Sequence, residues 1–245
     1  MLTALADGAL LAEKTGSTPP TVIALHGWMR TGTDFSRIVE GMDAVSIHLP
    51  GFGITPPPPT AWGSQEYADS LAEAIAGFGP VVIVAHSFGG RVAVHLAATH
   101  PELVRGLVLT GVPLVRLVPA PAPALGFRIL RRLARLGLVS KKTMEAQREK
   151  RGSTDYRNAR GIMRDVLVKV TNERYEDSLV RITAPTRMVW GEDDPAAPAD
   201  AGLAASRFIR GAHFRTITGA GHLLEGHLED EVRSELQMLV AEVGS

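Results

Sequence analysis

The sequence predicts an α/β domain built on a mostly parallel, doubly wound sheet that is flanked by helices. Along most of the 245 residues, short apolar runs rich in β-branched residues alternate with longer helical patterns. This alternation is typical of a parallel sheet covered by helices on both faces. The most continuously apolar runs show no polar–apolar alternation, so we expect them to be strands buried on both faces.

Six apolar runs are the expected strands, and four helical patterns lie between or after them. The strands are residues 22–25, 44–47, 81–84, 107–109, 187–190 and 214–217. The helices are residues 64–76, 89–98, 199–208 and 225–240. No repeat of fixed period is present, so we do not expect a repeat architecture.

Residues 113–181 depart from this alternation. Four prolines between residues 113 and 123 are followed by helical patterns over 127–138, 141–150 and 158–170. The stretch carries 16 Lys+Arg against 7 Asp+Glu, whereas the rest of the chain carries 10 against 19. We therefore expect one core domain, residues 1–112 and 182–245, interrupted by a basic helical insertion. The excess charge is typical of a solvated helical surface; alternatively, it offers an electropositive face to an anionic substrate or carrier.

The composition excludes several classes of protein. The 26 Lys+Arg balance 26 Asp+Glu, so a nucleic-acid partner is not expected. The absence of cysteine excludes a disulfide scaffold, a cysteine-ligated iron–sulfur cluster and a thiol nucleophile. No apolar stretch is long enough to span a membrane and no signal peptide pattern opens the chain, so we expect a soluble cytoplasmic protein without a membrane partner. The histidine spacing does not suggest a metal site.

The strongest local signal surrounds Ser87. The apolar run over 81–84 leads into Ala85-His86-Ser87-Phe88-Gly89-Gly90, and a helical pattern follows. A serine in this setting lies on a tight strand-to-helix turn with its hydroxyl exposed. Such a turn needs small residues two positions before and after the serine, and Ala85 and Gly89 satisfy this. We expect Ser87 to be a nucleophile; the alternative is a serine that merely lies in a βα turn.

Two backbone amides are expected to donate hydrogen bonds to a negatively charged oxygen near Ser87. The helix after Ser87 directs its N-terminal amides, including that of Phe88, and its positive dipole end toward the turn. His26-Gly27-Trp28 follows the first strand, and Gly27 lets the chain turn so that the Trp28 amide faces the same point. The amides of Trp28 and Phe88 therefore form the expected oxyanion hole. We expect His26 to brace this loop rather than to carry protons.

Acids and a histidine follow two later strands. Glu192, Asp193 and Asp194 come directly after the strand at 187–190, and His222 comes after the strand at 214–217. The carboxyl ends of parallel strands share one edge of the sheet, where such folds bind ligands. We therefore expect a serine, an acid and a histidine to meet there.

The other histidines are weaker candidates for a catalytic base. His227 belongs to the last expected helix, and His86 is expected to point away from Ser87 across the turn. The histidines expected to be packed or solvated are His48, His95, His100 and His213.

These motifs resemble the α/β-hydrolase superfamily over essentially the whole chain apart from the insertion. The matching segments are His26-Gly27-Trp28, Leu49-Pro50-Gly51-Phe52-Gly53, Ala85 to Gly90, Trp190 to Asp194 with Pro198, and Gly221-His222. In that family the acid loop reads Gly-x-x-Asp-x-x-x-Pro, which selects Asp194, and the insertion takes the place of a helical cap. Ala85 stands where glycine is more common, and the four prolines from 56 to 59 stiffen a loop that is usually more polar.

The resemblance implies a serine hydrolase that cleaves carboxylic esters through an acyl-enzyme without a cofactor or metal. Ser87 would be the nucleophile, His222 its base and Asp194 the residue that orients His222. The aromatic residues expected to contact a small-molecule ester substrate are Trp28, Phe88 and Phe52.

Alternative functions remain open at this point. A serine nucleophile disfavours haloalkane dehalogenase and epoxide hydrolase activity. Enzymes that cleave thioesters, lactones, amides or carbon–carbon bonds, and perhydrolases, have the same kind of site. Some related esterases act on methyl esters carried by acyl carrier protein and dock that acidic carrier on a basic cap. The residues suited to this here are Arg128, Arg131, Arg132, Arg135, Lys141 and Lys142. A non-catalytic small-molecule-binding protein is the alternative from another class, and a dinucleotide enzyme is weaker because Gly51-Phe52-Gly53 lacks a third glycine.

Overall fold

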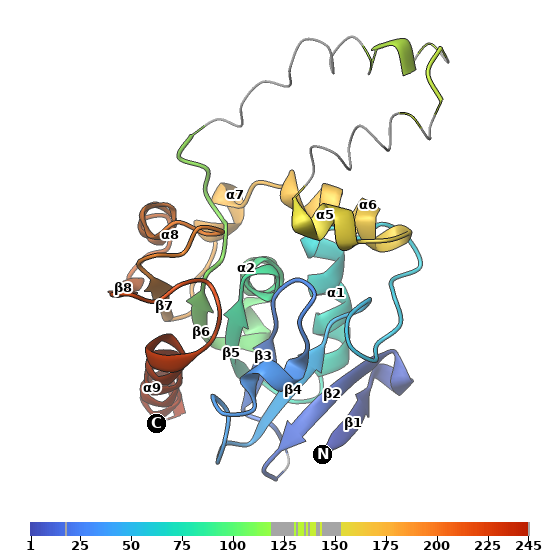
Figure 1. The fold of residues 1–245 in the computed structure, drawn as a ribbon. Coiled ribbons are helices and arrows are strands. Elements are labelled where there is room, and N and C mark those ends of the chain that lie inside the picture. The colour runs from blue at the N-terminus through green and yellow to red at the C-terminus, as the bar shows by residue number, and fades with distance from the viewer. Residues whose placement is uncertain are drawn as a thin grey trace.

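The computed structural model describes residues 1–17, 19–118, 130, 132–134, 136, 138–140, 143 and 153–244. These residues form an eight-stranded sheet with helices on both faces (Figure 1). The strands are β1 (Leu2–Leu5), β2 (Leu10–Thr15), β3 (Val22–Leu25), β4 (Ala44–His48), β5 (Val81–His86), β6 (Val104–Thr110), β7 (Thr186–Gly191) and β8 (His213–Ile217). The spatial order is β1-β2-β4-β3-β5-β6-β7-β8. All pairs from β4 to β8 are parallel, whereas β2 runs antiparallel to both of its neighbours.

The helices cover the two faces of the sheet in separate layers. They are α1 (Ser64–Ile75), α2 (Phe88–Thr99), α5 (Thr154–Asn158), α6 (Ile162–Thr171), α7 (Glu176–Leu179), α8 (Ala199–Ser206) and α9 (Gly226–Gly244), with short 3-10 turns η1 (Ala6–Gly8), η2 (Gly32–Phe35) and η3 (Pro101–Leu103). Within β5, Ile83 and Ala85 belong to the apolar cluster that includes α1 and α2, while Val82 and Val84 belong to the cluster that includes α9. Both faces of β5 are therefore buried, as its continuous apolar sequence predicts.

The predicted α/β class and the mostly parallel sheet are confirmed, and each of the six expected strands is present. The sequence analysis missed β1 and β2, which form an antiparallel hairpin at one edge of the sheet. Their side chains are mostly exposed or half-buried, so neither segment has the continuous apolar run that marks the central strands. No helix in the described part of the chain is long and apolar enough to cross a bilayer.

The described part of the insertion contains α5, α6 and α7, which lie beyond the end of the sheet toward which β5 and β6 point (Figure 1). The expected helix over 158–170 is found as α6. Of the expected helix over 127–138, residues 130, 132–134, 136 and 138 are described, and of that over 141–150 only residue 143 is described. Glu173 fastens this segment to α1: its carboxylate accepts hydrogen bonds from the Ser64 backbone N–H at 3.1 Å, from the Ser64 hydroxyl, and from the Tyr175 hydroxyl at 2.7 Å. Lys169 also forms an ion pair with Glu66 of α1.

A strained turn joins β5 to α2. Ser87 has φ of +50° and ψ of −112°, a backbone conformation that costs roughly 1–3 kcal/mol outside glycine. The turn lies so close to β3 that a Cβ at Gly89 would stand 2.4 Å from the Leu25 carbonyl oxygen and 2.7 Å from that of His26. The Gly89 amide uses this proximity to donate a 3.0 Å hydrogen bond to the His26 carbonyl. The missing side chain at Gly89 is therefore what allows the turn to pack against β3.

His26 braces the loops that follow β3 and β4. Its Nε2 accepts a 3.0 Å hydrogen bond from the Leu49 amide, and its Nδ1 lies 2.7 Å from the Gly27 carbonyl oxygen. The ring is fully buried, and burial lowers the pKa of His26 from 6.5 to about 4. His26 is therefore neutral at pH 7, with the proton on Nδ1 and a lone pair on Nε2.

The Gly89→Ala substitution tests the close approach of the turn to β3. Alanine favours a helix over glycine by about 1 kcal/mol, but its Cβ must displace backbone oxygens, so we expect a net loss of about 1–3 kcal/mol in the free energy of unfolding. Gly77→Ala is the matched control because nothing lies within 4 Å of its Cβ position. Urea unfolding measures both; equal stability of Gly89→Ala and wild type would show that the turn does not need this glycine.

The pKa of His26 predicts how acid acts on the fold. Between about pH 6.5 and 4, His26 binds a proton in the unfolded chain but not in the folded protein. The free energy of unfolding therefore falls as the pH falls through this range. Because of His26, the free energy of unfolding falls by about 2 kcal/mol between about pH 7 and pH 5. We expect His26→Gln to unfold more readily at pH 7 but to lose less stability on acidification. Urea unfolding at the two pH values measures this, and parallel losses in variant and wild type would contradict it.

Candidate active site

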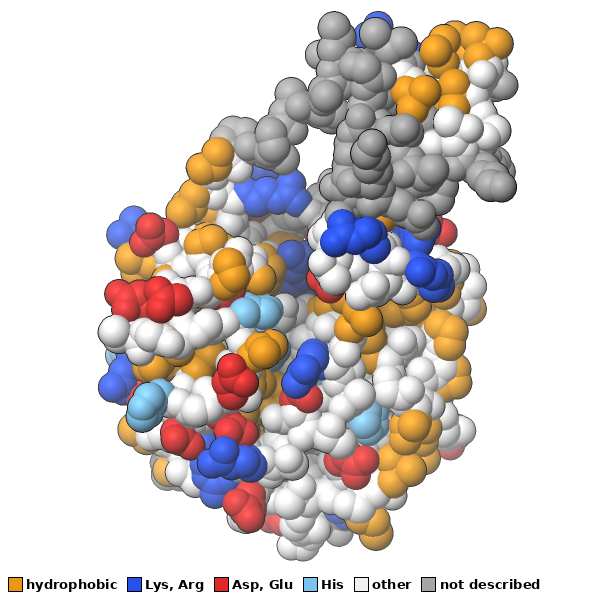
Figure 2. All heavy atoms as spheres, in the orientation of Figure 1, with side chains coloured by type: hydrophobic (Ala, Val, Ile, Leu, Met, Phe, Trp, Pro, Cys, Tyr) orange, Lys and Arg blue, Asp and Glu red, His pale blue; other side chains and the backbone are white. Residues whose placement is uncertain are grey.

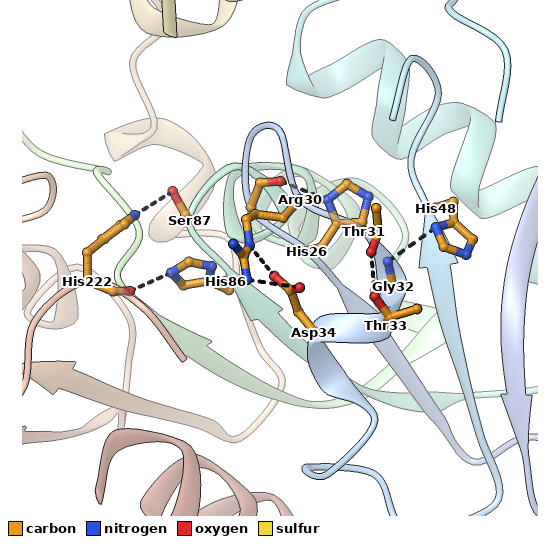
Figure 3. Close-up of polar contacts among 11 residues, drawn as sticks. His26, Arg30, Thr31, Gly32, Thr33, Asp34, His48, His86, Ser87 and His222 are labelled. Atoms are coloured by element: carbon orange, nitrogen blue, oxygen red, sulfur yellow. Dashed lines mark hydrogen bonds and ion pairs between the residues drawn. The ribbon is translucent and has the colours of Figure 1, made fainter. Parts of the chain in front are cut away.

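Three side chains from three loops meet at the carboxyl end of the sheet. His222 Nε2 lies 3.2 Å from Ser87 Oγ, and His222 Nδ1 lies 2.7 Å from Asp194 Oδ2. Figure 3 shows the Ser87 hydroxyl and the His222 ring directed toward each other across the end of β5. Because Nδ1 faces a carboxylate, the neutral ring carries its proton there and presents a lone pair at Nε2 to the Ser87 hydroxyl. The three residues that the sequence places 107 and 28 positions apart are thus in one hydrogen-bonded chain.

The Asp194 side chain is buried and fixed by hydrogen bonds. Its side chain is 1% exposed, and its Oδ1 accepts 2.8 Å hydrogen bonds from the backbone amides of Ala196 and Ala197. Both carboxylate oxygens therefore have partners, and the group is fixed toward His222. Glu192 and Asp193, the neighbouring acids that the residue pattern alone left open, are exposed.

His86 supports the loop that carries His222. Its Nε2–H donates a 2.9 Å hydrogen bond to the His222 carbonyl, and the two rings lie 4.8 Å apart between centroids (Figure 3). Burial, with a smaller contribution from the nearby His222, lowers the pKa of His86 to about 3. The sequence analysis expected His86 only to point away from Ser87 and assigned it no role, because a contact across 136 residues leaves no local signal.

Gly111 is a second site residue that the sequence analysis missed. It follows β6 with φ of +59°, and a Cβ there would stand 3.1 Å from His222 Nδ1 and 3.2 Å from Asp194 Oδ2. A side chain at this position would press on the hydrogen bond between those two residues. A glycine directly after an apolar strand was the only available signal.

The expected oxyanion donors are the backbone amides of Phe88, directly after Ser87, and of Trp28, in the loop after β3. Phe88 is the first residue of α2, so its amide has no partner within the helix. Among the described residues, neither the Phe88 amide nor the Trp28 amide donates a hydrogen bond. Both residues line the same hollow as Ser87, and their rings contact each other edge to face at 5.4 Å.

Ser87 opens into a cavity of about 470 Å³, here called the Ser87 cavity. Its walls include Gly27, Trp28, His86, Phe88 and His222 from the core, and Leu167, Val170 and Thr171 from α6. Phe52, which the sequence analysis grouped with Trp28 and Phe88, does not line it. Phe52 packs behind the Trp28 ring at 4.9 Å between centroids and borders an adjoining hollow of about 350 Å³.

The remaining histidines lie away from this chain of hydrogen bonds. His227 is exposed on α9, His48 accepts a hydrogen bond from the Gly32 amide, and His95 contacts Ser178. Within the described residues, no group of three or more His, Asp or Glu side chains could hold a metal ion.

Several known proteins are similar to this chain in sequence. Lipase LipV of Mycobacterium tuberculosis is 37% identical over 102 residues, 38% of this chain and 37% of that protein. The chain thus spans little more than a third of that relative. A pimeloyl-[acyl-carrier protein] methyl ester esterase of Xylella fastidiosa is 28% identical over 94% of this chain and 98% of its own.

Solved structures share the fold along the entire chain. A thermophilic esterase from Thermogutta terrifontis superposes with a TM-score of 0.70 at 20% identity, with both chains fully covered. A lipase described as putative from Acinetobacter baumannii gives a TM-score of 0.72 at 19% identity, covering 100% of this chain and 92% of the other. The profile of the Alpha/beta hydrolase family matches residues 22–235. The chain therefore belongs to the alpha/beta hydrolase family.

Proposed function

We propose that this protein is a serine hydrolase that cleaves carboxylic esters through an acyl-enzyme intermediate. The observation that carries the proposal is the hydrogen-bonded chain from Ser87 through His222 to the buried Asp194, opening into the Ser87 cavity. An activated serine needs a base within hydrogen-bonding reach and a third group that orients the base. Both conditions are met, and the reaction needs no cofactor.

In the acylation half of the reaction, Ser87 Oγ attacks the carbonyl carbon of the ester while its proton passes to His222 Nε2. The carbonyl oxygen becomes an oxyanion and accepts hydrogen bonds from the amides of Trp28 and Phe88. The intermediate then collapses, the bond to the alcohol oxygen breaks, and His222 returns the proton to the departing alkoxide. Asp194 stabilises the imidazolium that exists between these two transfers.

Deacylation repeats the same steps with water. His222 removes a proton from a water molecule as that molecule attacks the acyl carbon, and the proton then returns to Ser87 Oγ when the carboxylic acid leaves. One turnover thus consumes one ester and one water and releases an alcohol and an acid. The positive φ at Ser87 contributes because it holds Oγ clear of the strand and directs it at the His222 ring.

Relatives that are named as esterases support esters over the other acyl compounds. Methyl ester esterases of Xylella fastidiosa and Xanthomonas axonopodis align over 94% and 91% of this chain and over 98% and 96% of their own. A 2-hydroxy-6-oxononadienedioate/2-hydroxy-6-oxononatrienedioate hydrolase of Cupriavidus pinatubonensis, which aligns over 85% of this chain, is a relative whose name contains no ester. Trp28 and Phe88 give the cavity an aromatic wall suited to an acyl group.

Ser87→Ala tests the proposal directly. We expect wild type to be labelled by a fluorophosphonate probe and to hydrolyse p-nitrophenyl esters, and Ser87→Ala to lose the labelling and about 10⁴-fold or more in kcat/KM. Ser36→Ala removes an exposed serine outside the site and serves as the control. A folded wild type that the probe does not label would favour a non-catalytic small-molecule-binding protein. Unchanged hydrolysis by Ser87→Ala would refute the role of Ser87.

A second candidate function is hydrolysis of a methyl ester carried by an acidic acyl carrier protein. It is favoured by the name of the Xylella fastidiosa relative and by the basic composition of residues 113–181. Figure 2 shows Lys and Arg side chains around the hollow beneath the described part of the insertion. Of the residues expected to dock the carrier, Arg132 is described and exposed, whereas Arg128, Arg131, Arg135, Lys141 and Lys142 lie outside the described residues.

Salt separates this candidate from the first. Raising the salt from about 0.1 M to about 1 M shortens the Debye length from about 10 Å to about 3 Å. If the basic insertion docks a carrier, kcat/KM for the carrier-linked ester falls several-fold, while that of the free methyl ester of the same acid stays unchanged. If kcat/KM for the carrier-linked ester does not change with salt, the docking proposal is wrong, while the proposed esterase activity is unaffected.

A further inference from the structure

The Ser87 cavity contains more positive charge than the hydrolysis of a neutral ester requires. Three arginines line it, Arg30, Arg91 and Arg116, and Asp155 is the one carboxylate among its described lining residues. Charged groups at the wall of a partly enclosed cavity lose hydration, which is costly unless a partner of opposite charge compensates them. The partners of these arginines therefore indicate what the cavity is built to receive.

Arg30 already has its counter-charge. Its Nε lies 2.5 Å from Asp34 Oδ2 and its Nη2 lies 3.1 Å from Asp34 Oδ1, a bidentate ion pair (Figure 3). Arg91 and Arg116 differ, because neither forms an ion pair with any residue in the described part of the chain. Two guanidinium groups in one cavity thus form no ion pair with a carboxylate of the described residues.

The contacts that Arg91 and Arg116 make leave most of their charge uncompensated. Arg91 Nη1 donates a 2.6 Å hydrogen bond to the Val170 carbonyl, and Arg116 donates one to the Thr171 carbonyl. Both carbonyls lie at the C-terminus of α6, which presents a partial charge of about −0.5. In these contacts two full positive charges face about half a negative one, and the carboxylate of Asp155 is the further negative charge among the described lining residues. Each guanidinium uses one of its five N–H donors in these bonds.

The Arg91 guanidinium is also held in a fixed orientation. It lies over the Tyr175 ring with its central carbon 5.6 Å from the ring centroid. Burial raises the pKa of Tyr175 well above its ordinary value, so the ring is neutral and stacks on the guanidinium without cancelling its charge. Arg91 thus has a preset position and free donors, the properties that bidentate recognition of a carboxylate requires.

Arg91 and Ser87 are on one wall of the cavity. Arg91 comes four residues after Ser87 along α2, about 6 Å along the helix axis, and residues at this spacing lie on the same helix face. Helical side chains tilt toward the N-terminus, here toward Ser87. Both arginines line the cavity; Arg91 is half-buried, whereas Arg116 is exposed.

We propose that the substrate is an ester that carries a carboxylate a few carbons from its scissile carbonyl. Arg91 binds this carboxylate through its free donors, and Arg116 attracts it at the mouth of the cavity. This inference rests on the proposed esterase function, and it makes Arg91 a residue that determines specificity.

Matched ester pairs test the inference with the wild-type protein. On the acyl side, monomethyl esters of succinate, glutarate and adipate are compared with methyl butanoate, methyl pentanoate and methyl hexanoate. On the alcohol side, acetoxy-carboxylates are compared with alkyl acetates of equal length. We expect kcat/KM to favour the anionic member about 10-fold or more in at least one pair, mainly through KM. Equal or better turnover of the neutral member in every pair would overturn the inference.

Variants then assign the preference to a residue. Arg91→Gln is expected to reduce the preference for the anionic ester about 10-fold, and Arg91→Lys is expected to fall between the two because it keeps the charge but not the planar fork. Arg116→Gln is expected to give a smaller reduction. Arg207→Gln removes an exposed arginine outside the cavity and should change neither rate. A preference that survives in both Arg91→Gln and Arg116→Gln would refute the assignment.

Binding of glutarate itself separates this inference from the proposed function. Titration calorimetry with glutarate needs no turnover, and we expect the wild type to bind it more tightly than it binds pentanamide, which has the same chain length and no charge, with the difference lost in Arg91→Gln. Turnover of neutral esters without any preference for anionic esters would support the proposed esterase function and overturn this inference. Glutarate binding without turnover of any ester would uphold the anion site and reject the esterase. Failure of wild type to discriminate glutarate from pentanamide would overturn the anion site whatever the turnover.

Discussion

The site depends on one close contact between two chain segments, the turn at Ser87 and the end of β3. Gly89 lies against the carbonyls of Leu25 and His26, and this proximity brings Phe88 and Trp28 to the one cavity into which Ser87 opens. The positive φ of Ser87 follows from the same geometry, since the chain must reverse sharply between a buried strand and a helix. The strain is maintained because β5 is buried on both faces and α2 packs along its length. Ser87 is thus positioned by a strand that is buried on both faces and by the helix packed against it.

Burial assigns different chemical roles to three histidines that lie near one another. His26 and His86 are enclosed, which lowers their pKa values to about 4 and about 3, so both act as neutral hydrogen-bonding braces. His222 is 21% exposed in its side chain and is the one of the three that faces a carboxylate at 2.7 Å. A protonated His86 would repel the imidazolium that forms on His222 during the proposed reaction. The low pKa of His86 therefore serves the same step as the carboxylate of Asp194.

The sequence predicted the parts of this structure that have a local cause. The central strands carry continuous apolar runs because both of their faces are buried, and the Ser87 turn carries small residues because β3 leaves no space there. The β1–β2 hairpin has one half-exposed face and lacked such a run. Choosing Asp194 among three adjacent acids required a family pattern, and the hydrogen bond from His86 to the His222 carbonyl joins residues 136 positions apart. Contacts of this kind form only when the sheet is assembled, so they cannot be predicted from a short stretch of sequence.

The C-terminal end of α6 has a consequence for the range of substrates. That end is fastened by Arg91 to α2, by Arg116 to the segment after β6, and through Glu173 to the start of α1. Two helices of the core and the first residues of the insertion thus hold one border of the Ser87 cavity. Enlargement of the cavity at this border for a bulkier molecule would break these hydrogen bonds.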